Sequence, residues 1–195
     1  MQEQSKASAR RANDWRFANR WFVGRGIDIG CGDDPINPSD WPFVSDIVPY
    51  DVIYGHSDAT YLKEIEDTSF DFVHSSHCLE HLPNFRAAMA NWLRVLKKGG
   101  FIICTVPEEL LYECGRWPSM FNSGHRTSFT MRSTQILPKS INILHELWKL
   151  PVDVEHVTLL TEGWSREKFG KDQTLLGAEC SIEFVAKKAS ESCPW

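Results

Sequence analysis

The feature that most constrains this chain is a short apolar stretch that ends in two glycines one residue apart, in the segment GIDIGCGDD at residues 26–34. Glycine reaches backbone conformations that other residues avoid, and it lets a ligand approach the main chain more closely than a Cβ atom permits. A strand that ends in such a turn is typical of the edge of a parallel sheet where nucleotides bind. Because two glycines also occur in ordinary turns, the meaning of this pair depends on the residues beyond it in the chain.

Asp46 is a carboxylate that follows the glycine turn in the next predicted strand. We predict a second strand over Phe43–Ile47, which places Asp46 near its carboxyl end and beside the glycine turn. A carboxylate there can accept hydrogen bonds from both hydroxyls of a ribose, so Asp46 predicts nucleoside recognition. The alternative is an aspartate that caps a turn.

Apolar segments alternate with helical or polar segments, a pattern typical of a mainly parallel sheet that is covered on both faces. At 195 residues the chain has the length of a single domain, residues 1–195, with one core. We expect helices in residues 1–22, at Asn84–Leu96 and around Gln135–Leu150, and strands at Arg25–Ile29, Phe43–Ile47, Val52–Tyr54, Phe70–Ser75, Phe101–Val106, Val154–Leu159 and Ala178–Ala186. The expected fold is therefore a three-layer α/β/α sandwich.

The charge of the chain bears on its partners. Lysine and arginine number 21 against 26 aspartates and glutamates, a net charge of −5, which disfavours a nucleic-acid partner bound through its phosphates. The apolar runs are far shorter than the ~20 residues that span a bilayer. The six cysteines show no metal-binding or disulfide spacing. We therefore expect a soluble, cytoplasmic protein that binds no membrane.

Four segments in order carry a family resemblance: DIGCG at 28–32, SDAT at 57–60, SFDFVHSSHCLEHL at 69–82 and RVLKKGGF at 94–101. Together they resemble the class I, Rossmann-like S-adenosylmethionine-dependent methyltransferases. The resemblance implies a seven-stranded sheet whose last strand is antiparallel, with S-adenosylmethionine as cofactor and S-adenosylhomocysteine as product. Only residues 35–42 separate the glycine turn from the second strand, so the family's first crossover helix must be very short or absent.

The resemblance also implies where the cofactor binds. The glycine turn would hold its methionine part, Asp46 its ribose, and Asp58 with Ala59 its adenine. The expected cofactor-binding residues are Asp28, Gly30, Cys31, Gly32, Asp46, Ile47, Asp58, Ala59, Ser75 and His77.

A second motif, at residues 77–81, is typical of a zinc site. Residues 77–81 read HCLEH, the H-x-x-E-H signature of inverted zinc peptidases, in which His77 and His81 would bind zinc and Glu80 would act as base. Such a site needs a long helix, and Pro83 cuts this one short. A zinc hydrolase is therefore the weaker alternative, and we expect no metal.

The segment 107–127 follows the fifth predicted strand and should overhang the reaction centre. Expected substrate-binding residues are Glu108, Tyr112, Trp117, Phe121 and Arg126. His125 is the expected general base because imidazole titrates near neutral pH, and His77 is a second catalytic candidate.

The sequence thus predicts a methyltransferase that acts on a small-molecule or sugar-type acceptor. The short C-terminal region leaves little room for a separate substrate domain, so part of the pocket could come from a second subunit of a homodimer. A binding module that keeps the fold without chemistry is the remaining alternative.

Overall fold

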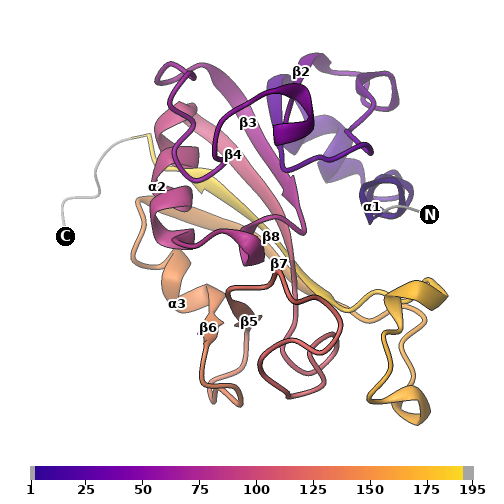
Figure 1. The fold of residues 1–195 in the computed structure, drawn as a ribbon. Helices are drawn as coiled ribbons and strands as arrows, with labels where there is room; N and C mark the ends of the chain where they lie inside the picture. The colour runs from indigo at the N-terminus through magenta and orange to yellow at the C-terminus, as the bar shows by residue number, and fades with distance from the viewer. Residues whose placement is uncertain (1–2, 191–195) are drawn as a thin grey trace.

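The computed structural model describes residues 3–190 and is built on one large sheet (Figure 1). Within these residues the sheet has six strands in the order β2-β1-β3-β4-β8-β7, and a separate ladder pairs β5 with β6. The strands are β1 (Gly24–Ile29), β2 (Val44–Tyr50), β3 (Phe70–Ser76), β4 (Leu96–Pro107), β5 (Ser128–Thr130), β6 (Ser140–Asn142), β7 (Val152–Leu160) and β8 (Ser181–Lys188). Only β8, the last strand in sequence, runs antiparallel to its neighbours in the large sheet.

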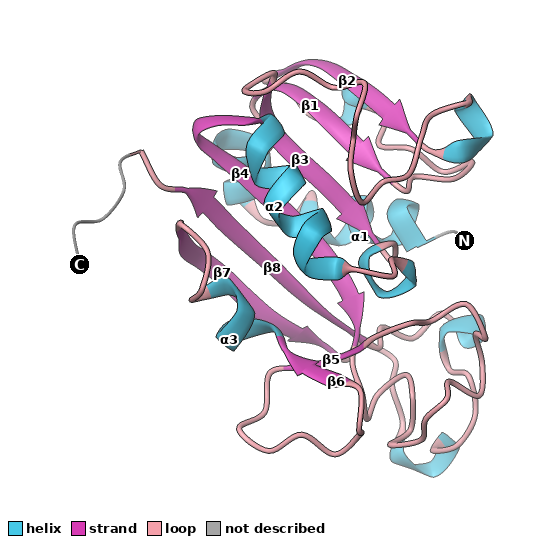
Figure 2. Cartoon of the chain, turned by 60° about the vertical axis from the view of Figure 1, so that its left-hand side comes forward, coloured by secondary structure: helices cyan, strands magenta, loops and turns pink. Residues whose placement is uncertain are grey.

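Helices cover one face of the sheet (Figure 2). Helix α2 (Phe85–Val95) begins at Asn84, whose side chain accepts a hydrogen bond from the Ala87 amide, and its apolar residues recur at helical spacing. Helix α3 (Ile143–Leu147) packs on the same face. Their apolar side chains share one core with Ile27, Ile29 and other residues that point from the strands to this face.

The N-terminal segment packs against the opposite face. Helix α1 (Glu3–Arg11) is followed by a π-helical turn (η1, Phe17–Trp21) and, after β1, by a 3-10 turn (η2, Pro38–Asp40). Phe17, Trp21 and Phe22 form a second core with residues of the strands. Two packed faces on one sheet confirm the three-layer prediction.

Several elements differ from their predicted bounds. Residues 1–22 contain two short helical pieces instead of one helix, and α3 is much shorter than the helix expected over Gln135–Leu150. Residues 52–54, expected as a strand, form a single 3-10 turn (η3, Val52–Tyr54), so the described residues contain six strands in the sheet instead of seven. Asp51 caps this turn and Gly55 ends it with φ 82°, which explains why the segment curls away from the sheet.

Three loops surround the carboxyl ends of the strands. A 3-10 turn (η4, Leu79–His81) follows β3, residues 108–127 follow β4, and residues 161–180 between β7 and β8 contain the 3-10 turns η5 (Arg166–Lys168) and η6 (Thr174–Leu176). The last two loops lie together in the lower part of Figure 1. Among residues 3–190, no helix combines the length and apolar character that a membrane span requires.

Candidate active site

The turn after β1 depends on its glycines. Gly30 has φ 70°, and a Cβ atom there would lie 2.3 Å from Sγ of Cys78, so the position is closed to larger residues. Gly32 has φ 54°, but a Cβ atom there would meet no atom within 4 Å. Gly30 is therefore needed for packing, whereas Gly32 exposes its main chain to open space that a ligand can fill.

The carboxylate beside this turn is Asp51 and not Asp46. Strand β2 continues to Tyr50, and Asp51 comes directly after it. Oδ2 of Asp51 accepts a hydrogen bond from the amide of Gly32 at 3.0 Å, and Oδ1 accepts one from the amide of Ile53 at 3.1 Å. These bonds hold the carboxylate at the mouth of the glycine turn.

The prediction that Asp46 ends the second strand is wrong. Asp46 is the third residue of β2 and is exposed, and its Oδ2 accepts a hydrogen bond from Nε of Arg25 at 3.2 Å. Ile47 belongs to the core between the sheet and the N-terminal segment. The strand extends through Pro49 because β2 is an edge strand, where a residue without an amide hydrogen costs no ladder hydrogen bond.

A pocket of about 330 Å³ opens between these elements, within the size range of small-ligand sites. Three of the predicted cofactor residues line it, namely Gly30, Asp58 and Ala59. Sequence reasoning missed the other lining residues: Tyr50, Asp51, Val52, Ser57, Cys78, Leu82 and Pro83. The signal that could have found Asp51 is its position as the second aspartate of the segment SDIVPYD, directly after the strand.

Tyr50 forms one wall of this pocket and is held in place by polar contacts. Its hydroxyl donates to Oε1 of Glu64 at 2.7 Å and lies 2.9 Å from Oγ of Ser57, and its ring stacks on His56 with centroids 4.6 Å apart. Hydrogen bonds from Ser57 and Tyr50 hold the pKa of Glu64 near 2. Burial, with Asp28 and Asp51 nearby, raises the pKa of the Cys31 thiol to about 12, so this thiol is neutral.

Asp28 faces the opposite side of the sheet. It is 1% exposed, and its carboxylate contacts the Ile36 amide at 2.8 Å and Nδ1 of His74 at 2.6 Å. Nε2 of His74 lies 2.9 Å from Nη1 of Arg11. Because a guanidinium can only donate, His74 accepts at Nε2 and donates from Nδ1, which makes it a neutral imidazole.

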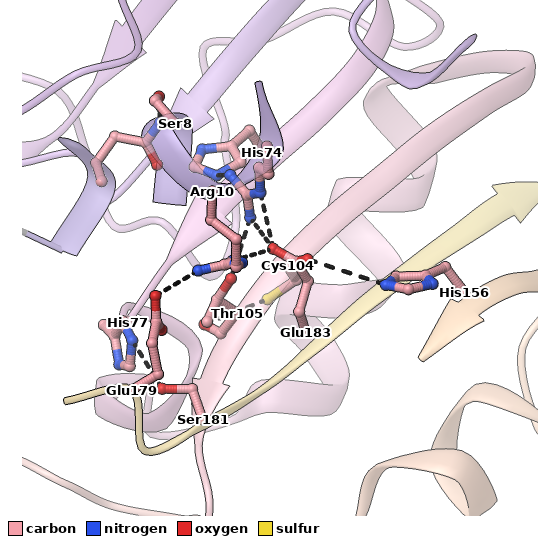
Figure 3. Close-up of polar contacts among 12 residues, drawn as sticks. Ser8, Arg10, His74, His77, Cys104, Thr105, His156, Glu179, Ser181 and Glu183 are labelled. Atoms are coloured by element: carbon pink, nitrogen blue, oxygen red, sulfur yellow. Dashed lines mark hydrogen bonds and ion pairs between the residues drawn. The ribbon is translucent and has the colours of Figure 1, made fainter. Parts of the chain in front are cut away.

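This buried network continues into α1 and β8, as Figure 3 shows around His74, Thr105 and Glu183. Nε of Arg11 donates to Oε2 of Glu183 at 2.7 Å, and the neighbouring Arg10 bridges Glu183 and Glu179 at 2.6 Å each. Burial opposes the charge of Glu183, but Arg11 and Arg10 together hold its pKa below the usual value. The network fixes α1 beside the carboxyl ends of the strands.

Two further predicted cofactor residues lie at the end of β3. Oγ of Ser75 is buried and donates to the carbonyl oxygen of Ile29 at 3.0 Å, so it links the two strands below the turn. His77 comes just after the strand with φ 54°, and its Nε2 lies 3.2 Å from Oγ of Ser181. His77 is thus placed at the carboxyl edge of β3, where the sequence predicted it.

The loop 108–127 brings only part of the predicted substrate set together. The rings of Tyr112 and Phe121 meet edge to face at 5.7 Å, and Tyr112 also lies 5.3 Å from the ring of His125. Trp117 is half-buried and Arg126 is exposed. Glu108 is fully buried, and its carboxylate accepts hydrogen bonds from the amides of residues 110 and 111 and from Nε of Arg132, so it stabilises the loop.

His125 is buried between carboxylates. Its Nδ1 lies 2.6 Å from Oε1 of Glu113, and its Nε2 lies 3.9 Å from Oε1 of Glu80. A general base needs a nitrogen within reach of the acceptor's proton, and both nitrogens here face carboxylates. The role of general base for His125 therefore stays a prediction that this geometry does not favour.

The helix required by the zinc-hydrolase alternative does not form. His77 precedes η4 with a left-handed backbone, and η4 itself contains only Leu79, Glu80 and His81 before Leu82 and Pro83 leave the turn. His77 and His81 are therefore not one helical turn apart on a common face. The peptidase arrangement of the motif is absent from this part of the chain.

Comparisons with known proteins bear on the family and the fold of the chain. The model of a family described as a methyltransferase domain matches residues 3–159. Among curated proteins, none matches the sequence. Among solved structures, similar folds occur in proteins of several bacteria.

A protein of Bacillus halodurans C-125, provisionally assigned as a methyltransferase, has a TM-score of 0.60 and 17% identity, covering 90% of this chain and 96% of its own. A Listeria monocytogenes protein, provisionally assigned as an S-adenosylmethionine-dependent methyltransferase, has a TM-score of 0.59 and 14% identity, covering 94% of this chain and 99% of its own. An S-adenosylmethionine-dependent methyltransferase of Mesorhizobium loti has a TM-score of 0.55 and 15% identity, covering 85% and 92%. At these identities the likeness shows the fold.

Proposed function

This chain belongs to the methyltransferase-domain family, and on that premise we propose that it transfers the methyl group of S-adenosylmethionine to a small-molecule or sugar-type acceptor. One observation carries the proposal: the pocket that joins the Gly30 turn, Asp51 and Asp58. The turn exposes main chain to open space at Gly32, and the two carboxylates can accept hydrogen bonds from hydroxyl and amino groups.

The residues present fit an adenosine-bearing ligand. Asp51 is oriented by two backbone amides and lines the pocket, which suits it to the two hydroxyls of a ribose. Asp58 already accepts a hydrogen bond from the Thr60 amide at 2.7 Å, so its carboxylate is also fixed, and with Ala59 it would meet the adenine. The main chain at Gly32 would hold the methionine part.

When bound, the cofactor would supply a methyl group on a positively charged sulfonium. Its transfer exchanges the carbon–sulfur bond for a bond between the methyl carbon and the acceptor, which leaves a neutral thioether and releases a proton from the acceptor. The protein's contribution is to align and desolvate the two reactants, which can lower the barrier by ~7–11 kcal/mol. His77, at the carboxyl end of β3, and the aromatic residues Tyr112, Trp117 and Phe121 would contact the acceptor. The negative net charge suits a neutral or cationic acceptor better than a nucleic acid.

Some broader expectations stay proposals of the same kind. These are a single domain over residues 1–195, a location in the cytoplasm, and a homodimer whose second subunit completes the acceptor pocket. Residues 1, 2 and 191–195 of that domain lie outside the described residues. Gel filtration of the full chain tests the homodimer directly.

The test of the proposal pairs two aspartates of the same region. Asp51→Ala should weaken binding of S-adenosylhomocysteine by about 30- to 150-fold, the ~2–3 kcal/mol of a charge-assisted contact, while Asp46→Ala keeps wild-type affinity. Calorimetry measures both affinities, and circular dichroism checks the fold. Equal affinities in the two variants would remove Asp51 from the site.

Turnover separates an enzyme from a binding module. The protein is incubated with S-adenosylmethionine and panels of small hydroxyl, amine and sugar compounds, and release of S-adenosylhomocysteine is measured. We expect acceptor-dependent release that Asp51→Ala lowers and Asp46→Ala does not. A cofactor that binds tightly and stays intact with every acceptor class would favour the non-catalytic alternative.

A further inference from the structure

Residues from two distant segments meet above the end of β3. Glu80 and His81 lie in η4, and His125 belongs to the loop 108–127. The amides of residues 126 and 127 donate to the carbonyl oxygen of Glu80 at 2.7 and 3.2 Å, which ties the loop to the turn. One side-chain atom from each of Glu80, His81 and His125 lies within 4.8 Å of the other two.

Glu80 is a buried carboxylate whose nearest partners are histidines at ion-pair distance. Its side chain is fully buried, and among the described residues neither of its oxygens accepts a hydrogen bond. Nitrogens of His77, His125 and His81 lie 3.5, 3.9 and 4.0 Å from Oε1, around it but not in hydrogen-bond geometry. A buried carboxylate whose oxygens accept no hydrogen bond is costly unless a cation lies against it.

His125 is oriented as a metal ligand usually is. Its Nδ1 is held by Oε1 of Glu113 at 2.6 Å, so Nε2 is the nitrogen that faces Glu80. Histidines that bind metals commonly donate their second N–H to a carboxylate, which fixes the tautomer and the ring. Glu113 is itself fully buried and thus well placed for this supporting role.

We propose that Glu80, His81 and His125 bind a divalent transition-metal ion such as Zn²⁺ through one carboxylate oxygen and two imidazole nitrogens. This is a donor set that zinc prefers, and three protein ligands leave a coordination position open. Bonds of ~2.0 Å place tetrahedral ligand atoms roughly 3.3 Å apart, so the three side chains close in when the ion binds. His81, whose side chain is 37% exposed, can move most easily and marks the side from which the ion enters.

Metal binding by the full chain, treated with chelator and without cofactor, tests the proposal separately from methyl transfer. ZnCl₂ is titrated by calorimetry, and CoCl₂ by the visible absorption that tetrahedral Co²⁺ gives when bound by imidazole and carboxylate. We expect one ion per chain, loss of binding in His81→Ala and His125→Ala, and binding about 10- to 100-fold weaker in Glu113→Gln. His145→Ala removes an exposed histidine on α3 and should change nothing.

Two results would overturn the proposal: no ion binds at micromolar protein and metal, or the His81→Ala and His125→Ala variants bind it as tightly as the wild type. Either would mean that the imidazoles alone neutralise Glu80. Circular dichroism verifies the fold of each variant. His81→Ala is decisive even if a change at a buried residue prevents folding, because its side chain is partly exposed.

Discussion

Asp28 and Asp51 lie at the carboxyl ends of neighbouring strands and have opposite surroundings. Asp28 is buried, and its oxygens are occupied by a backbone amide and by His74. Asp51 is half-buried, is held by two backbone amides and lines an open pocket. A carboxylate whose partners are all buried stabilises the fold, whereas one that is oriented but partly open can bind a ligand.

The same contrast separates the two faces of the sheet. On the N-terminal face, Arg11, His74, Thr105 and Glu183 form a closed network of buried polar groups. On the α2 face, the pocket is built from backbone turns, from buried side chains such as Tyr50 and from more exposed ones such as Asp51 and Val52. Changes in the network should therefore alter stability, and changes around the pocket should alter binding.

The largest expected effect is that of Arg11→Ala. This change leaves Glu183 buried without its main cation and His74 without its donor, and breaking a buried ion pair costs about 3–5 kcal/mol. Urea unfolding should show the free energy of unfolding falling by that amount. Arg16→Ala is the matched control, because Arg16 is partly exposed and pairs only locally with Asp14, so its cost should stay below about 1 kcal/mol. A similar cost for both variants would contradict the special role of the buried network.

Gly30→Ala comes next. The φ of 70° costs about 1–2 kcal/mol for any other residue, and contact with the Cys78 side chain adds about 1 kcal/mol or more. Gly32→Ala has the strain without the clash, so it should destabilise less but weaken binding of S-adenosylhomocysteine. Gly55→Ala, with φ 82° and open space, controls for strain alone. Wild-type affinity in Gly32→Ala would mean that the ligand does not approach that main chain.

The smallest effect is the dependence of stability on pH. Burial lowers the pKa of His74 below 6.5, although Asp28 partly offsets this. The folded protein therefore keeps His74 neutral while the unfolded chain binds a proton, so its stability is complete above pH 6.5 and falls below it, by at most about 1.4 kcal/mol per pH unit. Glu183, whose pKa is also lowered, adds to the loss as pH falls below 4.5.

Urea midpoints at pH 7.5, 6.5 and 5.5 measure this dependence. The control His145→Ala should keep the wild-type profile, since that side chain is exposed. His74→Asn should flatten the profile between pH 6.5 and 5.5. An unchanged slope in His74→Asn would show that His74 does not carry it.

Three of the ten residues that line the pocket, Gly30, Asp58 and Ala59, could be predicted because their signals are local. The glycine turn, the segment 57–60 and the helix before β4 each depend on neighbouring residues, and all three were predicted close to their observed positions. The predicted strand Phe43–Ile47 ended too early, because β2 continues through Pro49 to Tyr50. Whether a strand continues through a proline depends on whether it lies at the edge of the sheet, which the segment itself does not record.

The sequence by itself determined the class of fold, the family, the glycine turn and the edge of the sheet where the pocket opens, because backbone conformation and apolar periodicity depend on near neighbours. Only the tertiary structure decided that Asp51 and not Asp46 lies beside the glycine turn, that Arg11 joins His74 and Glu183, and that His125 faces Glu80. His125 lies 45 residues after Glu80, and Glu183 lies 172 residues after Arg11. Such contacts are set by the packing of whole elements, and no local pattern encodes them.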